Sequence, residues 1–161
     1  MRLFVAVFPP DEVSWDLRRQ LIGAGGPEVR LTPIERWHVT LAFIGEVAAE
    51  RLPEIERALG QVTVPTGTEL RLRGGGRFGR GRSTVLWAGV DGDLGELCRD
   101  VCAGLGLPAR DDFTPHLTVA YRDDPVVRLA LDSYAGPSWP LHEIALVRSV
   151  PGEGYTTLRS W

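Results

Sequence analysis

The sequence RWHVTLAF at residues 36–43 recurs in closely matching form as TPHLTVAY at residues 114–121. Histidine, threonine and alanine occupy the same places in both strings, and the second begins 78 residues after the first, close to half of the 161-residue chain. Two of the three histidines therefore stand two positions before a threonine. Because this spacing is too long for a solenoid repeat, it predicts two half-domains built on one plan.

Both strings have the β-branched and aromatic character of strands. Side chains at positions i and i+2 of a strand point to the same face, with Cα atoms about 6.6 Å apart. His38 and Thr40 are therefore predicted to face one ligand together, and His116 and Thr118 likewise. The alternate positions are predicted to point into the core and to fix the register of the strands; they are Val39, Leu41, Leu117 and Val119.

Two such strands brought together would place one imidazole on each side of a bound group, with both threonine hydroxyls donating to it. This arrangement suits in-line displacement at phosphorus, because one histidine removes a proton while the other supplies one near neutral pH. No metal is required, and no acidic cluster stands beside the histidines to build a two-metal site. The alternative interpretation is that His-x-Thr only fills the polar face of two half-exposed strands. His142 lacks the threonine partner and is interpreted as an ordinary histidine at the start of a strand.

The composition, 43% hydrophobic and 24% charged, is typical of a soluble globular protein and predicts one domain over residues 1–161. No apolar run approaches the roughly 18 to 20 residues of a membrane span, and residues 3–8 are too short for a secretory signal, so we expect a cytoplasmic protein without membrane contact. Cys98 and Cys102 are four residues apart, which favours buried thiols on one helix face over a metal or redox pair.

A net charge of −3 excludes a protein that coats nucleic acid through a generally basic surface. The charge is uneven, however, because five arginines fall within twelve positions that contain no acid: Arg71, Arg73, Arg77, Arg80 and Arg82. Such a patch can hold phosphate within an acidic protein.

Hydrophobic patterns predict an alternation of strands and helices. The expected strands are 2–8, 37–44, 69–73, 84–90, 116–121, 143–149 and 155–158. The expected helices are 11–22, 48–59, 93–105 and 125–131. Gly74, Gly75 and Gly76 are predicted to break the strand that begins at residue 69, leaving a hairpin with a flexible, arginine-rich tip.

The paired His-x-Thr strings resemble those of the two-histidine phosphoesterase superfamily. The rest of the chain is similar to its RNA 2′,3′-cyclic phosphodiesterase branch, also called 2′-5′ RNA ligase-like proteins. The resemblance runs nearly end to end, through residues 2–7, 37–45, 85–90, 115–120 and 144–149. It implies an α+β fold with two pseudo-twofold lobes, each an antiparallel sheet backed by helices, and a central cleft between them.

The resemblance also implies an enzyme that opens a terminal 2′,3′-cyclic phosphate on RNA to a 2′-phosphate, without metal or other cofactor. Its substrates would be RNA ends or cyclic-phosphate nucleotides, and we expect a monomer. By position, His38 and His116 match the catalytic histidines, and Thr40 and Thr118 match the phosphate-binding threonines. We assign His116 as the base and His38 as the acid, although the pseudosymmetry permits the reverse. Alternatives are a non-catalytic module that binds nucleotides or RNA ends, and a 2′-5′ RNA ligase.

One position departs from the family pattern. Many members have a phosphate-contacting arginine five residues after the second histidine, where this chain has Tyr121, followed by Arg122. In a regular strand Arg122 would share the face of His116, so we expect it to contact the phosphate. A bulge that shifts it is the alternative, as is a contact from Arg77, Arg80 or Arg82.

Two aromatic residues are candidates for substrate binding. Tyr121 is predicted to contact the phosphate or to stack on a base, the alternative being core packing. Phe78, flanked by glycine and arginine, is predicted either to stack on a base or to anchor its loop.

Overall fold

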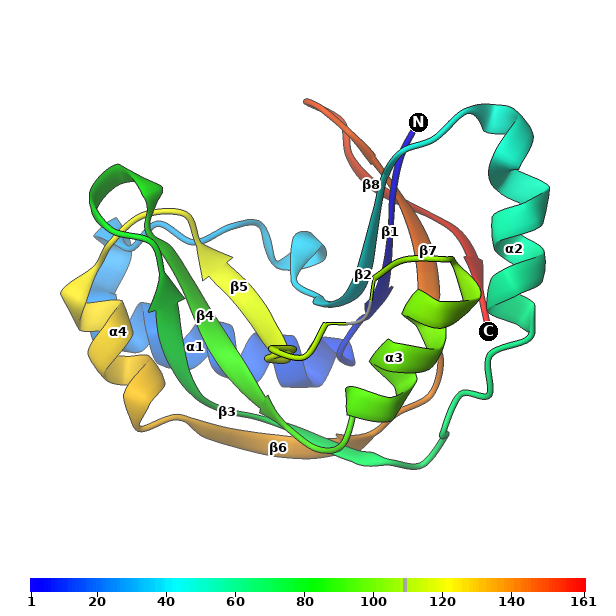
Figure 1. The fold of residues 1–161 in the computed structure, drawn as a ribbon. Helices are drawn as coiled ribbons and strands as arrows, with labels where there is room; N and C mark the ends of the chain where they lie inside the picture. Colours follow the sequence, from blue (N-terminus) through cyan, green and yellow to red (C-terminus); the bar gives the residue numbers. More distant parts are fainter. Residues whose placement is uncertain (109) are drawn as a thin grey trace.

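The computed structural model describes residues 1–108 and 110–161, which form one curled antiparallel sheet with helices on its outer faces (Figure 1). The strand order is β6-β3-β4-β5-β2-β1-β7-β8. The strands are β1 (Arg2–Val7), β2 (Val39–Glu46), β3 (Glu69–Phe78), β4 (Val85–Asp91), β5 (His116–Ala120), β6 (Ala135–Pro140), β7 (Ala145–Val150) and β8 (Gly154–Ser160). The helices are α1 (Asp11–Gly25), α2 (Leu52–Gly60), α3 (Gly95–Gly104) and α4 (Pro125–Asp132). This confirms the mixed α and β class.

The expected two sheets are joined into one. The seam lies between β2 and β5, which share a single register pair, Val39 with Leu117. On either side of that pair the two strands diverge, because each follows the curl of its own four-stranded half (Figure 1). Sequence patterns can predict individual strands. They do not predict that two strands far apart in the chain share a single register pair.

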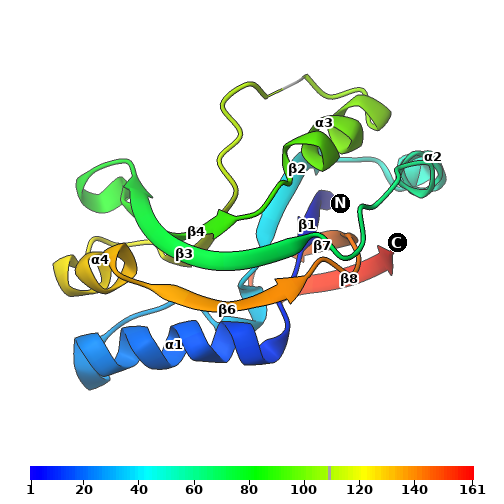
Figure 2. The ribbon, with the colours of Figure 1, turned by 90° about the horizontal axis from the view of Figure 1, so that it is seen from below.

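Each half of the sheet is covered by a helix from the other half. Helix α1 follows β1 but packs against α4 and β6, and α3 follows β4 but packs against β2 (Figure 2). The alternate residues of the two motif strands complete the core as predicted, since Val39, Leu41, Leu117 and Val119 are all fully buried. The polar residues of both motifs are therefore left on the concave face.

The glycine triplet does not end β3, contrary to the prediction. Gly74, at φ 62°, lies in an irregularity of the β3–β4 ladder, and the strand continues through Phe78. A Cβ atom on Gly76 would lie 2.5 Å from Cζ2 of Trp87, so the glycine is needed where an indole crosses the backbone.

Strand β6 was not predicted, because its sequence AGPSWP contains two prolines. It is an edge strand that pairs only with β3, and an edge position tolerates residues that cannot donate a ladder hydrogen bond. The helix expected from residue 48 begins at Leu52, after a 3-10 turn over Ala49–Arg51. In the described part of the chain, no helix is long and apolar enough to cross a membrane.

The seam offers a stability test. Leu117→Ala should lower the free energy of unfolding by about 2–5 kcal/mol, because it leaves a cavity beneath the one register pair that joins the described residues of the two motif strands. The matched control is Leu129→Ala on α4, where the side chain is 71% exposed and the change should stay within about 0.5 kcal/mol. Urea denaturation measures both, and equal losses would contradict the packing described.

Candidate active site

Strand β2 carries one extra residue inside the first motif. The adjacent residues Val5 and Ala6 of β1 pair with Ala42 and Thr40, so Leu41 has no partner across the ladder. Such a bulge reverses the alternation of faces, so Ala42 and Phe43, which lie between it and a second irregularity at Ile44, point to the opposite sides from those expected in a regular strand.

Strand β5 has the same feature at the same place in the second motif. Leu86 and Trp87 of β4 pair with Ala120 and Thr118, which leaves Val119 without a partner. In both motifs the extra residue is the third after the histidine. The two bulges therefore occupy equivalent positions in the two motifs.

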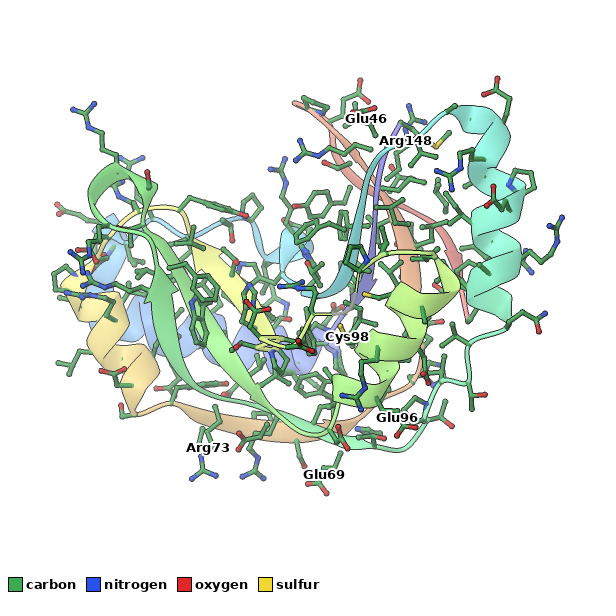
Figure 3. The ribbon with its side chains drawn as sticks, in the orientation of Figure 1. Glu46, Glu69, Arg73, Glu96, Cys98 and Arg148 are labelled. Carbon is green, nitrogen blue, oxygen red and sulfur yellow. The ribbon has the colours of Figure 1, made fainter. Side chains whose placement is uncertain are left out.

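Donors outside the ladder hold the carbonyls of both bulged residues. The thiol of Cys98, which Figure 3 labels on α3, donates to the carbonyl of Leu41 at 3.2 Å. The backbone N–H of Thr32 donates to the carbonyl of Val119 at 2.8 Å. Burial, with Cys102 beside it, raises the pKa of the Cys98 thiol to about 11, so the thiol keeps its proton and remains a donor. Both cysteines are buried and free, as predicted.

The bulges bring an aromatic residue from each motif to the face of the histidines. Phe43 and Tyr121 both stand five residues after a histidine, an odd offset that a regular strand would place on the far face. Instead both line the same cavity as the histidines, and they are 66% and 65% exposed.

The expectation for Arg122 is corrected by the same feature. Strand β5 ends at Ala120 and its alternation is inverted after Val119, so Tyr121 lines the cavity and Arg122 does not. Arg122 is exposed beyond the end of the strand.

A cavity of about 490 Å³ joins the two motifs. His38, Thr40, His116 and Thr118 all line it, so the structure brings together the four residues that the spacing predicted. The other lining residues are Arg2, Leu3, Phe4, Thr32, Arg36, Phe43, Gly45, Tyr121, Ser149 and Tyr155. Among the described residues, two arginines and no carboxylate line this cavity, which suits an anionic ligand.

Backbone carbonyls fix the orientation of both imidazoles. Nδ1 of His38 donates to the carbonyl of Arg36 at 2.6 Å, and Nδ1 of His116 donates to that of Thr114 at 2.8 Å. Because a carbonyl can only accept, each neutral ring carries its hydrogen on Nδ1 and keeps a lone pair on Nε2. Nε2 of His38 lies 3.0 Å from Oγ1 of Thr40, whose hydroxyl donates to it in the neutral state.

Aromatic side chains hold both rings in place. Around His38 the ring centroids of Phe4 and Tyr155 lie at 4.8 and 5.4 Å. Around His116 those of Phe78 and Trp87 lie at 5.0 and 5.7 Å.

The two histidines influence each other's protonation. Burial lowers the pKa of His38, the hydrogen bond to the Arg36 carbonyl opposes this, and the charge of His116 lowers it further. His38 is therefore neutral near pH 7, and a proton on His116 disfavours a second proton on His38. The doubly charged state of the pair is therefore disfavoured.

The remaining predicted residues do not line the cavity. Phe78 is 43% exposed and packs edge-on against His116, so it positions that ring from outside. Arg77 lines a separate hollow of about 410 Å³ together with Arg128 of α4. Arg80 and Arg82 are exposed in the tip between β3 and β4 (Figure 1).

Sequence reasoning missed several residues of the site. Arg36 is the first residue of the quoted string at residues 36–43, two positions before His38. Its place in the repeated string was a signal that it lies near the histidine. Its guanidinium carbon lies 5.7 Å from the ring centroid of Tyr155, a residue that the β7–β8 hairpin brings from the far end of the chain. Burial, and then the charge of Tyr155, raises the pKa of the Tyr121 hydroxyl, while Arg36 opposes the rise. Tyr121 is thus within electrostatic reach of Arg36 and Tyr155.

No group of three or more histidine, cysteine, aspartate or glutamate side chains lies close enough to hold a metal ion in the part of the chain that the structure describes.

Comparisons with known proteins agree with this geometry. The family model of the 2′-5′ RNA ligase superfamily matches residues 15–153. An RNA 2′,3′-cyclic phosphodiesterase of Archaeoglobus fulgidus is 34% identical over 89% of this chain and 86% of its own. The crystal structure of TT0787 of Thermus thermophilus matches with a TM-score of 0.79 at 30% identity, covering 100% of this chain and 97% of that one. Escherichia coli LigT complexed with ATP matches with a TM-score of 0.76 at 28% identity, covering 99% and 96%.

The coupling of the two histidines can be measured by NMR titration of their ring protons. His38 should titrate below 6.5, and His116→Gln should move its midpoint upward, because a neighbouring positive charge is removed. The midpoint should remain below 6.5 in the variant, since burial is the larger cause. Arg82→Ala, outside the cavity, should leave it unchanged. If the His38 midpoint were the same in His116→Gln as in the wild type, the two rings would lie too far apart to cooperate.

Proposed function

This chain belongs to the 2′-5′ RNA ligase superfamily, and from that we propose that it hydrolyses the terminal 2′,3′-cyclic phosphate of RNA to a 2′-phosphate. The observation that carries the proposal is the placement of two imidazoles, one from each motif strand, in one cavity without a carboxylate among its described lining residues. The substrate class rests on the relatives' names. Structures of E. coli LigT with phosphate and with 3′-AMP support a phosphate-bearing ligand for this fold.

The reaction needs one base and one acid. Nε2 of His38 takes a proton from water as its oxygen bonds to phosphorus, and the bond from phosphorus to O3′ breaks. Protonated His116 gives its proton to O3′, leaving the phosphate on O2′. The lowered pKa of His38 supports this order, the reverse of the one assigned by resemblance, because a general base must be neutral before substrate binds. Both groups belong to the protein, so the proposed mechanism uses no metal.

The phosphate charge is balanced by groups around the two rings. In the proposed complex, the hydroxyls of Thr40 and Thr118, which line the cavity, donate to the non-bridging phosphate oxygens. We assign the guanidinium contact expected of Arg122 to Arg36, because Arg36 lines the cavity and its backbone holds His38. Tyr121 lines the same cavity and serves as a hydroxyl donor or as a stacking face for the terminal base.

We also propose that the two halves are lobes related by an approximate twofold axis. Three observations support it. The motif strands β2 and β5 adjoin at the centre of the sheet, each carries its bulge three residues after the histidine, and each half is covered by a helix from the other.

The function is tested with an oligonucleotide ending in a 2′,3′-cyclic phosphate, in the presence of EDTA. His38→Ala and His116→Ala should each lower kcat by about 10²- to 10⁴-fold, because each removes one proton transfer. His142→Ala, outside the cavity, is the matched control and should retain full activity.

The products decide between the alternatives. The expected product is a 2′-phosphate, resolved from the 3′-phosphate by chromatography. Tight binding without turnover by the wild-type protein would indicate a binding module, and joined products with 5′-hydroxyl RNA would indicate a ligase. A fully active His116→Ala enzyme would exclude the mechanism.

The order of acid and base is tested separately with a p-nitrophenyl ester of a nucleoside phosphate. Nitrophenolate leaves without a proton, so an enzyme that lacks only its general acid should still cleave this diester. His116→Ala should therefore regain most of its activity on it, while His38→Ala should remain slow. Release of nitrophenol is followed by absorbance. Rescue of His38→Ala instead would restore the order assigned by resemblance.

A further inference from the structure

The cavity is longer than the phosphate site at its base. Ala6 of β1 pairs with Thr40, and Arg2 of the same strand pairs with Ser149 of β7. Arg2 and Ser149 line the same cavity as the histidines. Because four residues of a strand span about 13 Å, the cavity runs along β1 from the histidines to the start of that strand.

The wall between these two ends is aromatic. Phe4 and Phe43 are register partners on adjacent strands, with ring centroids 6.5 Å apart, and both line the cavity. Phe4 is buried beneath, whereas Phe43 is 66% exposed. An exposed phenyl ring on the wall of this cavity is a stacking face for an unpaired base.

The far end of the cavity carries a positive charge. Arg2 is exposed, and none of the ion pairs among the described residues involves it. Its register partner Glu46 is the nearest acid across the ladder, but that carboxylate lies 3.4 Å from the amino group of Met1. The Arg2 guanidinium is thus available to an anion.

We propose that Arg2 binds a phosphodiester upstream of the cyclic phosphate, so that the end of a single-stranded RNA is bound more tightly than a free cyclic nucleotide. The cavity presents a phosphate site, an aromatic face and a cation in that order, which is the order of groups along a polynucleotide. Arginine is well suited to phosphate because its guanidinium donates two parallel hydrogen bonds. This inference rests on the proposed function.

The experiment compares two substrates, adenosine 2′,3′-cyclic phosphate and a trinucleotide ending in a 2′,3′-cyclic phosphate. Arg2→Ala should raise KM for the trinucleotide several-fold at unchanged kcat, and should leave the kinetics of the mononucleotide unaltered. The dependence of log KM on log salt concentration should become shallower by about 0.7 for the trinucleotide, the value for one contact to a single-stranded phosphate. Any affinity tag is placed at the C-terminus, because Met1 pairs with Glu46.

The matched control is Arg148→Ala. Arg148 lies at the same end of the sheet and is also exposed, but it is adjacent to Ser149 in β7 and does not line the cavity (Figure 3). It should leave both substrates unaffected. A second probe is the trinucleotide with neutral methylphosphonate linkages, for which wild-type KM should rise to the Arg2→Ala value.

The inference is overturned if Arg2→Ala changes both substrates equally, changes neither, or if the neutral trinucleotide is bound as well as the charged one. Failure of the proposed function itself has a different signature, since the wild-type protein would then turn over neither substrate. In that case fluorescence anisotropy with the labelled trinucleotide compares the affinities of wild type and Arg2→Ala directly, and equal affinities would reject the Arg2 site.

Discussion

One extra residue in each motif strand is the constraint on which the site depends. A regular strand that buried Val39 and Leu41 would present His38 and Thr40 to the cavity but would turn Phe43 away from it. The bulge at Leu41 keeps all three on one face, and the bulge at Val119 does the same for His116, Thr118 and Tyr121. Each bulge leaves a carbonyl outside the ladder, and a donor from a distant segment satisfies it.

The chemistry of the imidazoles is set by backbone groups as much as by side chains. Each ring donates Nδ1–H to the carbonyl two residues before it, which turns Nε2 toward the cavity, and none of the described residues that line this cavity is a carboxylate. A carboxylate partner would raise the pKa of the histidine and would add negative charge beside a phosphate. Carbonyl partners orient the rings while leaving the cavity attractive to anions.

The sequence alone was sufficient for the residues whose placement depends on local geometry. His38, Thr40, His116 and Thr118 follow from the i, i+2 rule, and most helices and strands follow from their apolar periodicity. Arg122 could not be placed correctly, because the bulge that inverts β5 depends on how that strand pairs with β4. Arg2, Ser149 and Tyr155 reach the site through the pairing of β1, β7 and β8, and such long-range register has no local signature. The edge strand β6 could not be predicted for the same reason. Its prolines are tolerated only because the strand lies at the edge of the sheet.

The exchange of helices between the two halves determines how the molecule can move. Because α1 and α3 each pack on the half to which their preceding strand does not belong, opening the halves would strip both helices from the apolar surfaces that they cover. The packing of these helices therefore opposes any change in the spacing of the two imidazoles. With the two imidazoles held in this way, the active site needs no closing step to align its acid and base. Discrimination among ligands then depends on the side chains at the edge of the cavity.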